Sequence, residues 1–167
     1  MKLKNRHHLR SDEIEELKNH SKNQFGENFK DDLFPPDCKV EIAEIEDLFI
    51  VYITDGEFIL FEMDGVLIPS LKAILNNKLD LPKVVVDTGA IKFVVNGADI
   101  MRPGIVQIDD DIEKGSYIKI VDENYNKALA IGKSLYNSDV MKKMEKGRVI
   151  KNIHHINDKI WNFLEER

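Results

Sequence analysis

Two Asp-Gly pairs constrain the fold of this chain more than any other feature. Asp55-Gly56 and Asp64-Gly65 separate three β-rich runs, which span residues 48–53, 57–63 and 66–68. Asp-Gly is a strong signal for a two-residue hairpin turn, because both residues tolerate the positive φ that this turn requires. The first half of the chain is therefore predicted to contain a three-stranded antiparallel meander.

The segments before this meander predict one helix and one further strand. Ser11 is expected to be the N-cap of a helix over residues 11–23, because acidic residues and an apolar stripe follow it. The sequence from Phe25 to Phe29 interrupts that pattern, and Pro35-Pro36 excludes a continuing helix. Residues 39–45 alternate weakly between apolar and polar side chains, which favours a strand.

A domain boundary is expected near residue 80. Pro69-Ser70 introduces a short helix with apolar spacing from Leu71 to Leu75. Leu81-Pro82 then reads as a hinge, because a residue before proline is disfavoured in the helical region. The overall fold class is predicted to be α+β, with an N-terminal α/β domain over 1–80 and a second domain over 81–167.

The second domain is predicted to be rich in strands and to contain two short helices. Apolar spacing from Ala90 to Val95 favours a short helix, and Gly97 is placed where its C-terminus requires left-handed backbone. Asn137-Ser138 is expected to begin a second helix that ends at Gly147. Strands are expected over 84–86, 105–108, 117–121, 127–135, 149–153 and 159–163.

Composition excludes several classes of protein. The formal net charge is −6, but residues 1–80 hold ten Lys and Arg against seventeen Asp and Glu, whereas residues 81–167 hold fourteen against thirteen. A near-neutral second half can still carry a local basic surface. The longest apolar runs are far shorter than the roughly 20 residues of a membrane-spanning helix, so a cytoplasmic protein without membrane contact is expected.

Few residues suggest metal or covalent chemistry. Cys38 is the only cysteine, so no internal disulfide is expected. The pairs His7-His8 and His154-His155 lack a third ligand with suitable spacing, and Asp109–Asp111 lacks the pattern of a calcium loop. We expect no metal, no cofactor and no catalytic residues.

The second half resembles the PUA domain, which is named for pseudouridine synthases and archaeosine transglycosylases. The resemblance rests on the series from Val86 to Ile105, with Gly89-Ala90, Gly97-Ala98 and Met101 to Gly104, and on the later segments 128–134 and 147–152. It implies a β-pseudobarrel with two short helices over 81–167.

The rest of the chain resembles one subgroup of these proteins. Asp64 to Ser70, after a hairpin, is similar to the pre-PUA domain, and Ile153 to Phe163 is similar to the subgroup's ending. The pairing resembles archaeal relatives of the malignant T-cell amplified sequence proteins and the front of ligatin. Leu67 to Ser70 departs from the family pattern, in which an aromatic before the proline and a threonine after it are common.

This resemblance implies a non-enzymatic RNA-binding factor of translation. It implies work on the small ribosomal subunit and on the acceptor end of transfer RNA, in initiation or recycling, with a possible partner like density-regulated protein. The RNA-binding residues that it implies are Lys92, Asn96, Gly97, Ala98, Asp99, Met101, Arg102, Gly104, Lys133, Lys151 and Asn152.

Elementary chemistry supports these roles but leaves alternatives open. Gly97 and Gly104 would let backbone amides approach RNA, Met101 would contact an unstacked base, and Lys92 and Arg102 would neutralise phosphates. Equally, the glycines could serve only as a helix cap and a turn, and Met101 could belong to the core. Two other functions remain open: an RNA-modification enzyme or accessory protein, and a protein-interaction adaptor with secondary RNA contact.

Overall fold

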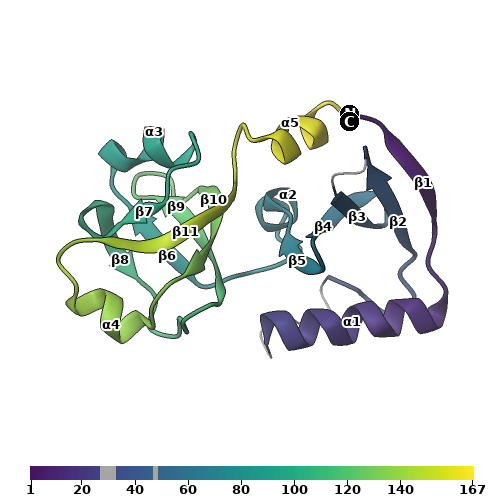
Figure 1. Ribbon diagram of the computed structural model, residues 1–167, viewed down its shortest axis with the longest axis horizontal. Helices are drawn as coiled ribbons and strands as arrows, with labels where there is room; N and C mark the ends of the chain where they lie inside the picture. The colour runs from purple at the N-terminus through teal and green to yellow at the C-terminus, as the bar shows by residue number, and fades with distance from the viewer. Residues whose placement is uncertain (27–32, 47–48) are drawn as a thin grey trace. The chain divides into compact units, whose positions relative to one another are not determined.

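The chain forms two compact units in a computed structural model that describes residues 1–26, 33–46 and 49–167. The first unit spans Met1–Asp80 and the second spans Leu81–Arg167 (Figure 1). Each unit has its own sheet. Part of the interruption expected at 25–29 and the predicted strand start at residue 48 lie outside the described residues.

The first unit is built on a five-stranded antiparallel sheet in sequential order. Its strands are β1 (Leu3–His8), β2 (Val40–Ile45), β3 (Phe49–Thr54), β4 (Glu57–Met63) and β5 (Val66–Pro69). Asp55 and Asp64 have φ values of 50° and 51°, and the glycine after each also has positive φ. The predicted meander with Asp-Gly turns is therefore confirmed. Strand β1 was not predicted.

Two helices accompany this sheet. Helix α1 (Ser11–Phe25) has Arg10 as its N-cap, so the expectation that Ser11 is the cap was wrong by one residue. The Glu13 side chain accepts a hydrogen bond from the Arg10 amide, which closes the first turn. Helix α2 (Leu71–Leu75) starts as predicted, with the Ser70 hydroxyl accepting a hydrogen bond from the Lys72 amide.

The second unit is a six-stranded sheet that curls into a pseudobarrel (Figure 1). The strands are β6 (Lys83–Val86), β7 (Ile100–Met101), β8 (Ile105–Ile108), β9 (Tyr117–Asp122), β10 (Ala128–Ser134) and β11 (Arg148–His155), in the order β7-β11-β10-β9-β6-β8. Strands β6 and β9 are parallel, and the other neighbours are antiparallel. The core is aliphatic, with Ile118, Ile120 and Ile150 among its fully buried residues.

Short helices lie between the strands of this unit, and one more follows the last strand. They are η1 (Thr88–Ala90), α3 (Ile91–Val94), η2 (Arg102–Gly104), α4 (Ser138–Lys143) and α5 (Lys159–Glu165). Helix α3 and the left-handed Gly97 that follows it confirm the prediction for this segment.

Two sequence-based predictions in this unit were wrong. Helix α4 ends at Lys143, and Met144 already has extended backbone, so Gly147 does not end the helix. Residues 159–163 form helix α5 instead of a strand, because the Asp158 side chain accepts a hydrogen bond from the Trp161 amide at 2.7 Å and acts as an N-cap. No helix among the described residues is long and apolar enough to cross a membrane.

Candidate functional site

An exposed aromatic ring marks the first wall of a groove in the second unit. Ile91, Val94 and Val95 of the α3 segment pack on the barrel core. Because these residues occupy the core-facing side of the helix, Phe93 points away from it and is 57% exposed. The Lys92 ammonium lies 5.1 Å from the centre of the Phe93 ring, so a cation accompanies this apolar surface.

The start of this wall is held by Asp87. Its Oδ1 accepts a hydrogen bond from the Ala90 amide at 2.9 Å and caps η1. The Asp87 amide donates to the Gly104 carbonyl, which joins the start of the first wall to the second wall. A β-carbon on Gly104 would lie 3.2 Å from the β-carbon of Ala90, so the two walls approach most closely where residue 104 has no side chain.

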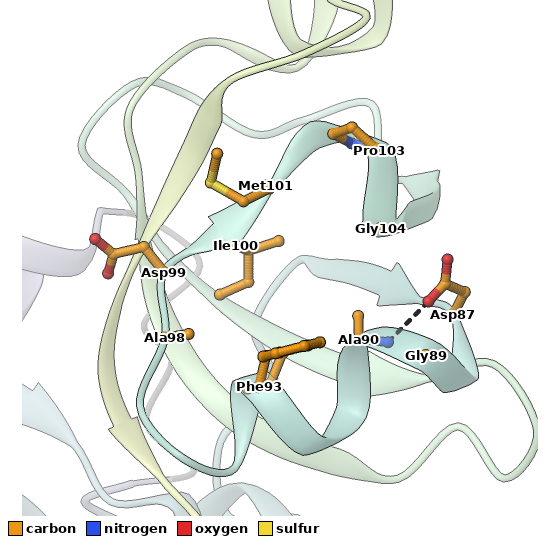
Figure 2. Close-up of a pocket in the computed structure, with 11 residues that line it drawn as sticks. Asp87, Gly89, Ala90, Phe93, Ala98, Asp99, Ile100, Met101, Pro103 and Gly104 are labelled. Atoms are coloured by element: carbon orange, nitrogen blue, oxygen red, sulfur yellow. Dashed lines mark hydrogen bonds between the residues drawn. The ribbon is translucent and has the colours of Figure 1, made fainter.

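The second wall carries Met101, Pro103 and Gly104 (Figure 2). Met101 is 50% exposed, so the alternative that it belongs to the core is excluded. Figure 2 shows Met101 and Phe93 on opposite sides of the groove, with Ile100 between them. The groove encloses about 560 Å³, which is within the usual range for ligand sites. It is lined by Asp87, Gly89, Ala90, Phe93, Val94, Ala98, Asp99, Ile100, Met101, Pro103 and Gly104.

The turn at the far end of the groove is fastened to β11 by Asn152. Its side-chain amide donates to the carbonyls of Val94 and Ala98, at 3.0 and 3.1 Å. Asp99 accepts from the Asn152 backbone amide at 2.9 Å and from the Arg148 guanidinium at 3.0 Å. The shape of the groove therefore depends on a strand about fifty residues further along the chain.

Truncating Asn152 should loosen this turn. In Asn152→Ala the carbonyl of Ala98 loses its side-chain donor, and the carbonyl of Val94 keeps only the Gly97 amide. We expect the free energy of unfolding to fall by about 1–3 kcal/mol. Urea denaturation of the full chain measures this change. Asn96→Ala is the matched control, because the exposed Asn96 side chain makes a single bond to the Lys92 carbonyl. Equal stability of the two variants would contradict the role of Asn152.

The structure brings only some of the predicted RNA-binding residues into one place. Ala98, Asp99, Met101 and Gly104 line the groove, and Lys92 lies beside Phe93. Asn96 and Gly97 form the turn between the walls, and Asn152 fastens that turn from β11.

Lys133 and Lys151 form a separate pair. They lie directly opposite each other on β10 and β11, and both are exposed. Neither lines the groove. Two like charges in directly opposed positions disfavour the sheet, so this pair gives the surface of β10 and β11 a local positive charge at some cost in stability.

Arg102 has an internal role that sequence reasoning did not anticipate. It is half-buried, its Nε donates to the Met141 carbonyl at 2.7 Å, and its Nη1 donates to the Ile105 carbonyl at 3.2 Å. These bonds connect helix α4 and strand β8 to η2. Its contact with phosphate stays a prediction, and only the remaining N–H groups are available for it.

Sequence reasoning missed Phe93 and Asp87. A signal for Phe93 was present, because an aromatic residue outside the apolar stripe of an amphipathic helix has no place in the core. Asp87 carried the signal of a cap before a helical turn. Among the described residues, no three His, Cys, Asp or Glu side chains gather in a way that could hold a metal ion.

Comparison with known proteins defines the class of this fold and groove. Residues 82–156, which include both walls, match the PUA domain family. A solved structure of a hypothetical protein from Pyrococcus horikoshii OT3 has a TM-score of 0.81 and 32% identity, over 95% of this chain and 99% of that one.

Relatives of similar length extend the match to the whole chain. An uncharacterized protein of Methanocaldococcus jannaschii is 42% identical over 98% of this chain and 99% of its own length. Translation machinery-associated protein 20 of Saccharomyces cerevisiae is 40% identical over 84% and 81%, and malignant T-cell-amplified sequence 1-A of Xenopus laevis is 30% identical over 92% and 88%. The chain therefore belongs to the family of PUA-domain proteins that includes these relatives, and the resemblance inferred from the sequence is confirmed.

Proposed function

We propose that this protein is a non-enzymatic, cytoplasmic RNA-binding factor of translation. In this proposal it binds the acceptor end of transfer RNA, ribosomal RNA of the small subunit, or both, in initiation or recycling. Its relative in S. cerevisiae is named for association with the translation machinery. The observation that carries the proposal is an apolar groove with Phe93 and Met101 exposed on opposite sides.

The groove suits an unstacked base. Single-stranded nucleic acid is bound by aromatic rings that stack on bases, with cations placed beside the backbone. Phe93 offers the ring, and Met101 offers a flexible apolar side chain that adapts to a flat base. Lys92 is the cation next to the ring. A base between these side chains would leave its phosphates outside the groove, within reach of exposed lysines.

The acidic first unit suits a protein partner better than RNA. Residues 1–80 have seven more acidic than basic residues, and such a surface repels phosphates. In this proposal the first unit recruits a partner that resembles density-regulated protein, while the second unit binds RNA.

Removing the ring of Phe93 tests the proposal. For Phe93→Ala we expect binding to transfer RNA to weaken by about 1–3 kcal/mol, or roughly 5- to 150-fold, because the stacking surface is lost. Fluorescence anisotropy measures the affinity of transfer RNA with and without its single-stranded 3′ end, at two salt concentrations. The loss is expected only for RNA that retains this end.

Tyr125→Ala is the matched control for this experiment. Tyr125 is also an exposed aromatic residue, at 86%, but it lies in the turn between β9 and β10 and does not line the groove. We expect its removal to leave the affinity within about twofold. If Phe93→Ala binds like the unchanged protein at both salt concentrations, the groove is not the RNA site.

A further inference from the structure

The groove is apolar along its length but has a carboxylate near each end. Asp99 and Asp87 both line it, and Figure 2 shows Asp99 near Ala98 and Asp87 beyond Gly89. Phosphate would be repelled by the Asp87 carboxylate, and the rest of the lining is largely apolar. If RNA enters the groove, the base must enter and the backbone must remain outside. The polar edge of that base then meets whatever hydrogen-bonding groups the lining provides.

The two carboxylates differ in whether they keep an oxygen that can still accept a hydrogen bond from a ligand. Asp99 is neutralised, because one oxygen accepts from Arg148 and the other accepts from the Asn152 amide. Asp87 forms no ion pair with any described residue, and its Oδ1 accepts the Ala90 amide that caps η1. Its Oδ2 receives no hydrogen bond from any part of the chain that the structure describes. Asp87 therefore retains a charged acceptor at the groove.

A charged acceptor distinguishes among bases. Cytosine and adenine each carry an exocyclic amino group, which donates hydrogen bonds, whereas uracil carries a carbonyl oxygen in the position of the cytosine amino group. An ionised carboxylate only accepts hydrogen bonds. It therefore attracts the amino group and repels the carbonyl oxygen. This difference in binding free energy is large because hydrogen bonds to charged groups are stronger than those between neutral groups.

We propose that Asp87 is a specificity-determining residue, and that it makes the groove prefer a base with an exocyclic amino group over uracil. This inference rests on the proposed function, because it needs RNA to bind at Phe93 and Met101. It adds the identity of the preferred base and the atom, Asp87 Oδ2, that selects it.

The test compares two pyrimidines of almost equal shape. The unchanged full-length protein is titrated with hexamers of cytidine and of uridine at neutral pH, and we expect cytidine to bind about tenfold more tightly. A hexamer of N4,N4-dimethylcytidine, which has lost both amino hydrogens, is expected to bind no better than uridine. This arm needs no protein variant, so it does not depend on how a substitution affects folding.

Asp87→Asn is the protein arm of the same test. Asparagine is about as effective as aspartate at capping a helical turn, so its Oδ1 can still accept a hydrogen bond from the Ala90 amide. Its side-chain nitrogen replaces the second acceptor with a donor. We expect the preference for cytidine to disappear or to reverse toward uridine, with the melting temperature unchanged.

Each outcome decides between the inference and the proposed function. The selection by Asp87 would be overturned by equal affinity for the two hexamers, or by a cytidine preference that survives Asp87→Asn. In either case a loss of binding in Phe93→Ala would still support the groove as the RNA site. Failure of every hexamer and of transfer RNA to bind would overturn the proposed function and this inference together.

Discussion

Replacing Asp158 with alanine is expected to lower the free energy of unfolding by about 3 kcal/mol. One Asp158 oxygen bonds to His154 Nδ1 at 2.6 Å and also accepts from the His155 amide at 2.9 Å. The other accepts from the Trp161 amide at 2.7 Å and caps helix α5. The variant therefore loses the cap and removes the carboxylate from the fully buried His154 ring at the same time.

The pH dependence of stability distinguishes the charge of Asp158 from its capping role. Burial is the largest single influence and raises the pKa of Asp158. The hydrogen bond from His154, the electrostatic attraction of His154 and the backbone hydrogen bonds from Trp161 and His155 together lower that pKa below its ordinary value. A carboxyl group whose pKa is lowered by folding stabilises the fold above its unfolded pKa of about 3.9. That contribution is lost as the pH falls below this value toward the lower folded pKa.

Thermal denaturation from neutral pH to about pH 2 measures both parts of this prediction. Asp158→Asn is the control, because its oxygen can still cap α5 while the charge is absent. We expect Asn to be intermediate in stability, and the difference between the unchanged protein and Asn to shrink in acid. A difference between them that stays constant across this range would show that the charge contributes nothing.

Replacing Gly132 with alanine is the second substitution with a large expected effect. A β-carbon at this position would overlap Ile150 Cγ2, and it would lie 3.0 Å from the Lys151 carbonyl oxygen and 3.1 Å from Ile120 Cδ1. Ile150 and Ile120 are fully buried in the barrel core, and the carbonyl belongs to the neighbouring strand. Because a backbone atom cannot move aside cheaply, we expect a loss of about 2–3 kcal/mol.

Urea denaturation of Gly132→Ala measures this loss against Gly89→Ala. Gly89 has ordinary backbone, and a β-carbon there would make only a normal contact of 3.4 Å with Asp87. We expect Gly89→Ala to remain within about 0.5 kcal/mol of the unchanged protein. If Gly132→Ala also stayed within this limit, strands β10 and β11 would have to shift apart at a lower cost in free energy than their packing indicates.

Local signals in the sequence were sufficient for the elements whose cause is local. The turns at Asp55-Gly56 and Asp64-Gly65 form because their own residues tolerate positive φ. The short helix before Gly97 forms because its apolar residues recur on one face. Strand β1 was missed for the opposite reason. Five of its six residues are exposed, so no apolar alternation marks this edge strand.

The ending of the chain shows how a local signal can mislead. Ile160, Phe163 and Leu164 are buried, and their spacing fits a helix as well as a strand over so few residues. Asp158 decides in favour of the helix, because its side chain caps α5 and also binds His154 and His155. A cap is recognisable in a sequence, but its second role depends on where strand β11 lies.

The sequence by itself determined the family, the Asp-Gly meander and the segment from Val86 to Ile105 that supplies both walls of the groove. Only the tertiary structure decided which side chains those walls expose. Phe93 and Met101 lie on opposite sides of the groove because Asn152 and Asp99 fasten the turn between them to β11. Arg102 is turned inward because it donates to the carbonyls of Met141 and Ile105. Apart from Ile105, these partners are distant in sequence. Hydrogen bonds between distant segments leave no pattern in the spacing of neighbouring residues.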